Sequence, residues 1–328
     1  MGTKRAPETL LEAVTFFSDP DMALNFVANL RWPDGVTCPR CGGQSVSFLK
    51  TRRIWKCKGC TKQFSAKLGT VFEDSPIPLE KWLPAMWMLV NCKNGISSYE
   101  LARALGVTQK TGWFMLHRLR LVMQARSFMK MSGEVEADET FIGGRARFMH
   151  TDRKQRTMKG RRTGVIGKVA VMGLLDRHGN DGHSVVRTVV VPNVRRRNLQ
   201  QHIREHVVMD GESTLYTDAL KSYEPVSPKG WRPSELYIHK VIDHAEAYAQ
   251  GNVHTNGMEN FWSLLKRMIK GTYVSVEPFH LFRYLDEQCY RFNLRKDSDR
   301  GRFVNALSSI VGRRLTYAAL TMAPEPQR

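Results

Sequence analysis

The segment "GEVEADETFIGG", residues 133–144, concentrates acids in a chain of 328 residues whose formal net charge is +19. The acids of this segment are Glu134, Glu136, Asp138 and Glu139. Polar and apolar residues alternate here, which predicts a β-strand with Glu134, Glu136 and Asp138 on one face. Three carboxylates on one face repel each other unless solvent or a cation separates them. The segment is therefore either a solvated edge strand or part of a cation site.

Two later segments favour the cation site. "STLYTDALKSY", residues 213–223, reads as an apolar strand that ends at Asp218. "HTNGMENFWSLLKRMIKG", residues 254–271, reads as an amphipathic helix, with Glu259 and Lys266 two turns apart on its polar face. Asn256 lies one turn before Glu259 on that face and could contribute beside it or in its place. We choose Glu259 because a carboxylate binds a divalent ion better than an amide does.

The order of the expected elements indicates an α/β fold. Strands are expected at residues 133–144, 169–176, 184–191, 213–218 and 236–243. A helix at 195–207 separates the third strand from the fourth, and helices return over 254–295. This order is typical of a ribonuclease-H-like domain, a mixed sheet flanked by helices.

In such a domain Asp138, Asp218 and Glu259 would converge and bind two divalent ions. Oxygen ligands suit Mg²⁺ or Mn²⁺. Two such ions, about 3.5–4 Å apart, activate a nucleophile and stabilise the leaving oxygen at a phosphodiester. Glu136 is not needed for this arrangement, and we expect it beside the site or in solvent.

Four of the six cysteines have the spacing of a zinc site. The pattern C-x2-C-x15-C-x2-C is formed by Cys38, Cys41, Cys57 and Cys60. Two such pairs predict a closed four-thiolate structural zinc site, which leaves no open position for catalysis. The alternatives are chance pairs or redox thiols. Cys92 and Cys289 lie alone, and we expect both to be buried thiols.

A segment after the four paired cysteines has the pattern of a helix-turn-helix. "SSYELARALGVTQKTGWFMLHRLR", residues 97–120, begins with an S-x-x-E capping box, and Gly106 and Thr108 provide a turn and an N-cap. If the second helix enters a major groove, Gln109, Lys110 and Thr111 would lie at base edges or phosphates. The alternative is an ordinary helical hairpin.

The charge indicates a polyanionic partner, since the sequence pI is about 9.9. Residues 145–168 contain nine Lys or Arg, Arg161 and Arg162 among them, against one acid. They are expected to lie along DNA phosphates, unless the segment is a solvated loop. A secretory signal and an apolar run of about 18 residues are both missing. These features disfavour secreted and membrane-spanning proteins and predict a cytoplasmic location, on the nucleoid when DNA is bound.

These patterns predict five consecutive regions. We expect N-terminal helices over 1–35, a zinc ribbon over 36–75 and a helix-turn-helix module over 76–130. A ribonuclease-H-like catalytic domain over 131–296 would follow, with a C-terminal tail over 297–328.

Over residues 20–300 the sequence resembles bacterial insertion-sequence transposases of the DDE class, in particular the ISXO-like group. The resemblance is carried by "CPRCGG", "WKCKGCTKQFSAKLGTVF", "EADETFIGG", "LYTDALKSY", "HTNGMENFWSLLKR" and "FRYLDEQCYRFNLR". It implies a homo-oligomer that binds terminal inverted repeats and catalyses metal-dependent end cleavage and strand transfer into target DNA. Asp138, Asp218 and Glu259 would be the DDE residues, and Lys266 would contact DNA near the cut.

Two other classes of protein remain possible from the sequence. One is a nuclease of the same fold that cuts without joining. The other is a non-catalytic DNA-binding regulator that keeps the zinc ribbon and the helix-turn-helix beside a degenerate domain. The three acids argue against the regulator, and strand transfer with pre-cut ends would distinguish the nuclease.

Overall fold

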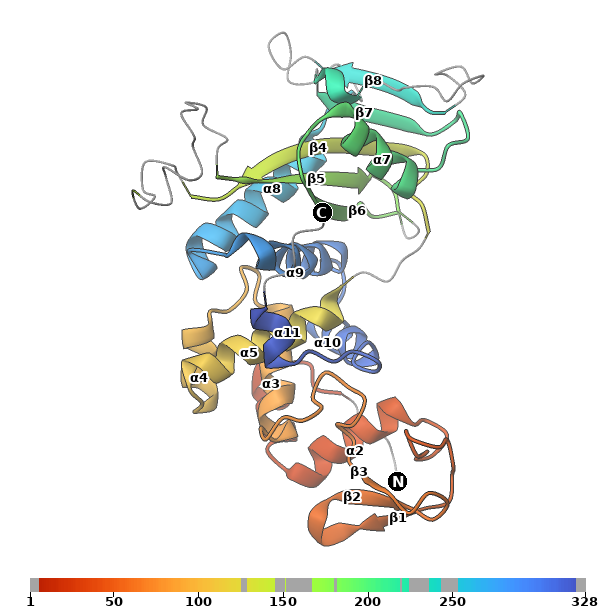
Figure 1. Ribbon diagram of the computed structural model, residues 1–328, viewed down its shortest axis with the longest axis vertical. Helices are drawn as coiled ribbons and strands as arrows, with labels where there is room; N and C mark the ends of the chain where they lie inside the picture. Colours follow the sequence, from red (N-terminus) through yellow and green to blue (C-terminus); the bar gives the residue numbers. More distant parts are fainter. Residues whose placement is uncertain are drawn as a thin grey trace. The chain divides into compact units, whose positions relative to one another are not determined.

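The computed structural model describes residues 6–124, 129–144, 151, 167–179, 182–218, 220–223, 236–242 and 253–322. The chain forms two compact units (Figure 1). The first, here called the outer unit, combines residues 1–124 with residues 294–328. The second, the central unit, is residues 125–293. The C-terminal segment thus belongs to the same unit as the N-terminus.

The outer unit is mainly helical. Its helices are α1 (Leu10–Phe17), α2 (Pro20–Arg31), α3 (Leu79–Asn91), α4 (Ser98–Leu105), α5 (Gln109–Arg120), α10 (Asp299–Ser308) and α11 (Tyr317–Thr321). The expected tail therefore contains two helices. The fully buried Phe303 of α10 lies 5.6 Å from Phe17 and 5.0 Å from Trp87 between ring centroids. Burial of this ring explains why the segment folds instead of trailing.

A small antiparallel sheet in the outer unit corresponds to the expected ribbon. Its strands are β1 (Val46–Leu49), β2 (Ile54–Cys57) and β3 (Gln63–Phe64), in the order β1-β2-β3. Trp55 stacks on Phe64 with 6.0 Å between ring centroids and also contacts Phe48. So few apolar side chains form a very small core, which is why a domain of this size usually needs a metal.

Helices α4 and α5 have the expected caps and turn. Ser97 and Glu100 form both hydrogen bonds of the capping box. Gly106 ends α4 in the left-handed region, with φ 61°, and Thr108 caps α5 by accepting from the N–H of Thr111. A Cβ on Gly112 would lie 2.9 Å from the carbonyl oxygen of Ser98, so only glycine permits this close approach of the two helices.

The central unit is built on a five-stranded sheet in the order β6-β5-β4-β7-β8. Its strands are β4 (Glu134–Ile142), β5 (Val169–Asp176), β6 (Val185–Val191), β7 (Thr214–Asp218) and β8 (Ile238–Ile242). β4, β5 and β6 pair antiparallel, whereas β7 pairs parallel with both β4 and β8. This is the ribonuclease-H-like arrangement, and all five expected strands are confirmed.

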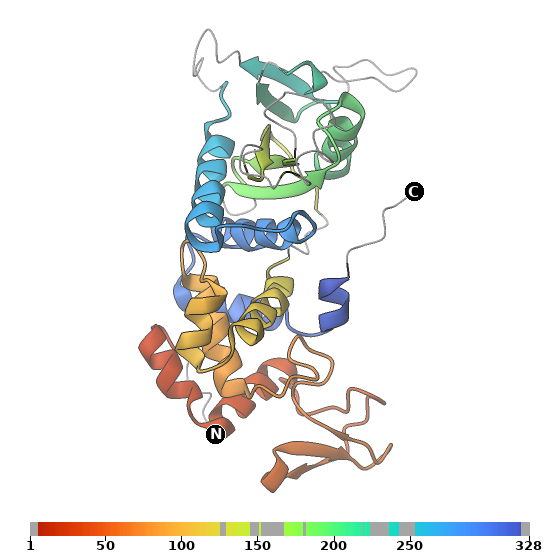
Figure 2. The ribbon, with the colours of Figure 1, turned by 60° about the vertical axis from the view of Figure 1, so that its left-hand side comes forward.

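Helices cover both faces of this sheet (Figure 2). On one face lie α8 (Asn256–Met268), which continues into a π-helix (Ile269–Tyr273), and α9 (Leu281–Asn293). On the other face α7 (Arg196–His206) packs against Val135 and Ala137. The described residues also contain 3₁₀ segments at Lys50–Arg52, Leu121–Met123, Lys221–Tyr223 and Pro278–His280. The face of β4 that carries Asp138 is thus the face covered by α8.

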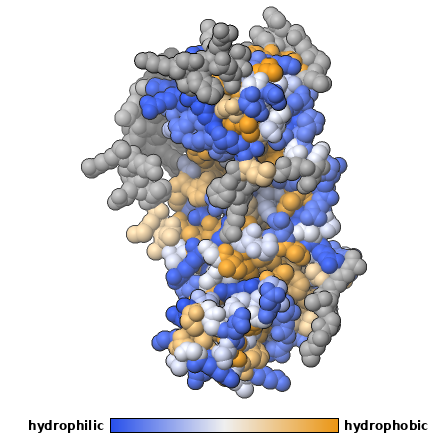
Figure 3. All heavy atoms as spheres, turned by 90° about the vertical axis from the view of Figure 1, so that its right-hand side faces the viewer, coloured by the Kyte–Doolittle hydropathy of each residue, from blue (hydrophilic) through white to orange (hydrophobic). Residues whose placement is uncertain are grey.

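The surface mixes hydrophilic and hydrophobic residues on the face shown in Figure 3. Among the described residues, no helix is both long enough and apolar enough to cross a membrane.

Candidate active site and zinc site

Strand register brings Asp138 and Asp218 together. The parallel ladder of β4 and β7 pairs Glu134 with Thr214 and Glu136 with Tyr216. The ladder ends there, but two residues further along each strand the same direction leads to Asp138 and to Asp218, the last residue of β7, and the charge of Asp218 acts on the Asp138 carboxylate. Residues in register on parallel strands share a face, and here that face is the one under α8.

The Asp138 carboxylate is held at both oxygens. Its Oδ1 accepts the N–H of Glu139 at 2.8 Å, and its Oδ2 accepts the indole N–H of Trp262 at 3.0 Å. Gly173 is the cross-strand partner of Asp138 on β5. A Cβ on Gly173 would lie 2.7 Å from the Trp262 ring, so the missing side chain lets the indole reach the carboxylate.

The electrostatics of Asp138 link the three predicted acids. Burial, together with the charges of Asp218 and Glu259, raises the pKa of Asp138 from its ordinary 3.8 to about 6. The Glu139 amide and the Trp262 indole oppose this rise by stabilising the carboxylate. Asp218 and Glu259, 41 residues apart in sequence, therefore act on the same carboxylate.

Glu259 lies in the first turn of α8, and its charge contributes to the raised pKa of Asp138. Its side chain is exposed, and Trp262, the residue that binds Asp138, follows one turn later. Lys266 is partly exposed two turns after Glu259, and Asn256 is exposed at the start of the helix. α8 thus presents an acid near Asp138 and a cation further along the same helix.

Glu139 also belongs to this region, and the sequence reasoning gave it no role. It points to the face opposite Asp138, where the Tyr223 hydroxyl donates to its Oε2 at 2.6 Å. Burial, with a contribution from the charges of Asp218 and Asp138, raises the pKa of Glu139 to about 7, although the Tyr223 hydrogen bond opposes the rise. The alternation of β4 could have revealed this position, since it places Glu139 on the face of Val135 and Ala137.

Glu136 was expected either beside the site or in solvent. It lies beside the site and is buried, so the solvent position is wrong. Its side chain is 2% exposed, and its Oε1 pairs with the Nε of Arg177 at 2.9 Å. Glu134 is more exposed and accepts from the Tyr216 hydroxyl at 2.5 Å and the His178 ring at 2.9 Å. A buried carboxylate needs a cation or several donors, and the guanidinium of Arg177 explains why Glu136 can be buried.

The four predicted zinc ligands form a compact cluster. The sulfur atoms of Cys38, Cys41, Cys57 and Cys60 all lie within 4.8 Å of one another. The Cys38–Cys60 and Cys41–Cys57 sulfur distances are 3.7 and 3.6 Å, against edges of about 3.8 Å for a tetrahedron of Zn–S bonds near 2.3 Å. Burial alone would raise the pKa of Cys38, but amides of Arg40 and Cys41 help lower it to about 7. The thiol chemistry and spacing fit a structural Zn²⁺.

The two isolated cysteines differ from each other. Cys289 is buried as expected, and burial raises the pKa of its thiol to about 12. Cys92 is exposed, so the expectation of a buried thiol is wrong there. It follows the last residue of α3, where the chain leaves the helix in an extended conformation, with ψ 114°. The buried face of α3 ends with Val90, which leaves Cys92 outside the core.

Two families match this chain. Residues 130–293 match the ISXO2-like transposase domain, and residues 18–63 match the transposase zinc-ribbon domain. The first match covers the whole five-stranded sheet with α7, α8 and α9, and the second covers all four cysteines. The chain belongs to the ISXO2-like transposases.

Curated relatives agree with this family. A protein of the transposable element ISH50 from the archaeon Halobacterium salinarum is 28% identical over 305 residues, covering 90% of this chain and 97% of its own length. A transposase-like protein of Haemophilus influenzae is 37% identical over 108 residues, covering 33% of this chain and 80% of its own length. Both are described as uncharacterized. Because one relative is archaeal, the family does not establish the bacterial origin that the sequence resemblance suggested.

In this transposase the three residues expected to touch DNA from α5 differ in exposure. Lys110 is exposed, with its ammonium 4.9 Å from the centre of the Tyr317 ring. Gln109 is partly buried and donates to the Ser98 hydroxyl at 2.8 Å, and the hydroxyls of Thr111 and Thr108 are 2.9 Å apart. Lys110 is therefore the α5 side chain best placed for a partner. Arg161 and Arg162 lie outside the described residues.

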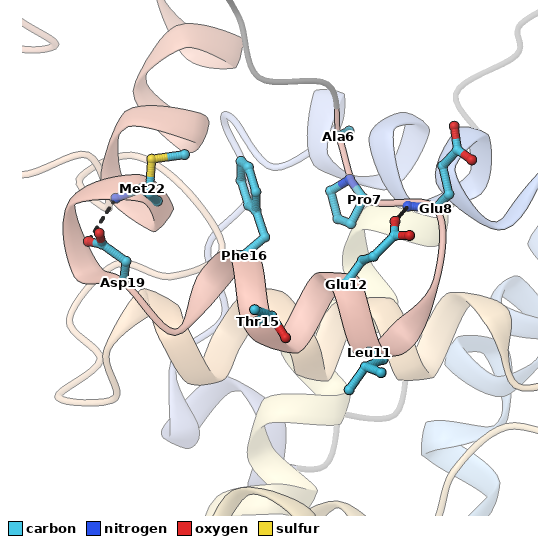
Figure 4. Close-up of a pocket in the computed structure, with 9 residues that line it drawn as sticks. All are labelled: Ala6, Pro7, Glu8, Leu11, Glu12, Thr15, Phe16, Asp19 and Met22. Carbon is cyan, nitrogen blue, oxygen red and sulfur yellow. Dashed lines mark hydrogen bonds between the residues drawn. The ribbon is translucent and has the colours of Figure 1, made fainter.

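A hollow of about 730 Å³ lies over α1 and the start of α2 in the outer unit. Figure 4 shows Glu12 accepting the N–H of Glu8 there, and Asp19 accepting the N–H of Met22. These carboxylates serve as local caps for the helix starts. The hollow therefore lacks the convergent acids of the central unit and is not the candidate active site.

Proposed function

We propose that this chain is the DNA transposase of an insertion sequence. It binds terminal inverted repeats, cuts the DNA at the element's ends and joins the freed ends to target DNA. The observation that carries this proposal is the clustering of negative charge at Asp138. Asp218, from the neighbouring parallel strand, and Glu259, from α8, both act on this partly buried carboxylate. Membership of the transposase family supports it.

The residues of this site fit divalent metal ions. Burial and neighbouring acids raise the pKa of the Asp138 carboxylate to about 6. A cation beside it would lower that pKa and favour the charged carboxylate. Asp138, Asp218 and Glu259 would hold two Mg²⁺ or Mn²⁺ ions through oxygen. When bound, these ions supply Lewis-acid stabilisation of the attacking and leaving oxygens at the phosphodiester.

The chain's own residues would orient this chemistry. The Glu139 amide and the Trp262 indole fix the direction of Asp138, so its oxygens need little reorganisation when DNA binds. Water attacks the phosphodiester at the element's end and frees a 3′-hydroxyl, which then attacks a target phosphodiester. Each bond broken is matched by a bond formed, so no external energy source is needed. Lys266 would contact a phosphate near the cut.

The outer unit would supply recognition. The ribbon, held by Zn²⁺ at Cys38, Cys41, Cys57 and Cys60, and the helix-turn-helix, through Lys110, would bind the terminal repeats. Arg161 and Arg162 of the basic segment would lie along phosphates. Strand transfer joins two ends to one target, which favours a homo-oligomer on DNA.

The test compares four variants of the full chain: Asp138→Asn, Asp218→Asn, Glu259→Gln and the control Glu134→Gln. The first three should lose end cleavage and strand transfer by orders of magnitude in Mg²⁺ and Mn²⁺, and should still bind end DNA. Glu134→Gln should keep all three activities. Near-normal cleavage by Asp138→Asn would overturn the proposal. Cleavage without joining of pre-cut ends by the wild type would identify the same-fold nuclease instead.

A further inference from the structure

We infer that Glu136 and Arg177 are positioning residues that hold the first turn of α8 on the sheet and thereby place Glu259 opposite Asp138. This inference rests on the proposed function, which gives Glu259 its role as the third acid. Neither residue needs to touch metal or DNA. The Glu136 side chain is buried, at 2% exposed, and that of Arg177 is mostly covered, at 11% exposed.

Glu136 acts as a cap from outside the helix. Its Oε2 accepts the N–H of Met258, the third residue of α8, at 2.9 Å. The first N–H groups of a helix have no partner within it, and the positive end of the helix dipole favours an anion there. Glu259 is the next residue after Met258. A carboxylate on β4 therefore fixes the backbone directly before the third acid.

Arg177 extends this hold to His254, two residues before the helix. Its Nε donates to Oε1 of Glu136 at 2.9 Å, and its Nη2 donates to the carbonyl oxygen of His254 at 2.7 Å. His254 and Met258, four residues apart, are thus tied to one buried carboxylate. The guanidinium holds both ends in a fixed geometry, because its donors lie in one plane.

Gly257 shows how closely the helix is held. A Cβ at this position would lie 2.9 Å from Oε2 of Glu136 and 2.9 Å from Cδ1 of Leu175. Only glycine leaves room for the helix start to approach the carboxylate. The helix cannot slide toward the sheet, because the contacts are already tight, or away from it without breaking the Met258 hydrogen bond.

The same strand carries the anchor and the site. Glu136 and Asp138 are two residues apart on one face of β4. β4 therefore fixes the position of Asp138 directly and that of Glu259 through Glu136. Glu134 is a matched control on the same face. It lies 3.7 Å from Arg177 and bonds to Tyr216 and His178, and none of these three residues belongs to α8.

The test measures Mn²⁺ binding to the full-length protein by isothermal titration calorimetry, without DNA and without turnover. Glu136→Gln and Arg177→Lys should each weaken Mn²⁺ affinity by about 10- to 100-fold, the usual effect of losing a group that orients a ligand. The Mn²⁺ concentration for half-maximal end cleavage should rise by a similar factor. Glu134→Gln should stay within about twofold of wild type, and Asp138→Asn serves as the reference for loss of a ligand.

The outcomes separate the two claims. If Asp138→Asn binds Mn²⁺ as wild type does, the proposed function itself fails. If Asp138→Asn weakens binding and both positioning variants bind as wild type, the proposed function stands and this inference is overturned. If Glu136→Gln does not fold at the assay temperature, Arg177→Lys and Gly257→Ala decide, because the added Cβ displaces the same contact. Wild-type Mn²⁺ affinity in these two folded variants overturns the inference.

Discussion

The zinc site of the outer unit and the carboxylate site of the central unit are built over very different chain lengths. The four cysteines lie within 23 residues, and their sulfurs lie within 4.8 Å of one another. The three acids span residues 138–259 and come from two strands and a helix. Among the described residues, no other group of three or more His, Cys, Asp or Glu gathers so tightly.

The difference follows from what each site must do. A structural site can close fully around its ion, because nothing needs to enter. The proposed site for phosphodiester chemistry would have to leave room for DNA, and the like charges of its acids repel one another without a cation. The ribbon should therefore depend on its metal for folding, whereas the central unit has its own apolar cores on both faces of the sheet. Metal loss should affect the two units differently.

The largest effect is expected for Cys57→Ser. Structural Zn²⁺ in small domains contributes about 10–16 kcal/mol of apparent binding free energy, so loss of one thiolate should abolish tight binding and unfold the ribbon locally. Elemental analysis should fall from one zinc per chain to almost none, while far-UV circular dichroism of the central unit's helices persists. Cys92→Ser is the control and should retain zinc. Purified wild type without zinc would contradict the assignment.

A smaller effect is expected from pH on the metal-free protein. The pKa values of Asp138 and Glu139 are raised to about 6 and about 7, so the folded chain keeps protons that the unfolded chain releases. Stability should therefore fall as pH rises from about 4 to about 7. Asp138→Asn should be more stable than wild type at pH 8 by about 1–3 kcal/mol and similar at pH 4.

Urea denaturation at pH 4, 6 and 8, with and without Mg²⁺, measures this effect. Mg²⁺ should stabilise wild type more at pH 8 than at pH 4, because it binds the charged carboxylates. Glu134→Gln is a control of opposite sign: the Tyr216 hydrogen bond lowers the pKa of Glu134, so its charged form favours the fold. If the stability of the metal-free wild type instead rises steadily from pH 4 to pH 8, the raised pKa values of Asp138 and Glu139 are contradicted.

Trp262→Phe should have a moderate effect on the carboxylate site. It removes the indole N–H that donates to Asp138 at 3.0 Å and keeps most of the buried ring. That hydrogen bond lowers the pKa of Asp138, so its loss should raise the pKa further and move the acidic limb of the cleavage pH profile upward. We expect the Mg²⁺ concentration needed for half-maximal cleavage at pH 7 to rise about tenfold. An unchanged pH profile would mean that the indole does not orient the carboxylate.

The smallest effect is expected for Lys110→Ala in α5. Removing one phosphate contact should weaken end-DNA binding several-fold and reduce the salt slope by about one unit. The loss should be similar on random DNA if Lys110 contacts only phosphate. Filter binding between 50 and 200 mM salt measures it, with Lys93→Ala, an exposed lysine after α3, as the control. Wild-type affinity on both DNAs would remove α5 from the interface.

Several features could be predicted because they depend on neighbours in sequence. The alternation over 133–144 predicts which acids share a face, and the S-x-x-E spacing predicts the cap of α4. The partner of Glu136 could not be predicted this way. Arg177 lies 41 residues later, directly after the end of the antiparallel β5, and only the register of the two strands brings them together. The exposure of Cys92 was missed because it depends on where the buried face of α3 ends.

The sequence by itself determined the ligand types and their local spacing. Side-chain direction repeats with the period of a strand or helix, so the cysteine pairs, the faces of β4 and the polar face of α8 follow from nearby residues alone. Only the tertiary structure decided which distant groups meet. The charge of Asp218 acts on Asp138 because β4 and β7 are parallel neighbours. The charge of Glu259 acts on it because Gly173 and Gly257 let α8 lie against the sheet. These contacts depend on register and on the absence of a Cβ, which act between segments 80 or more residues apart.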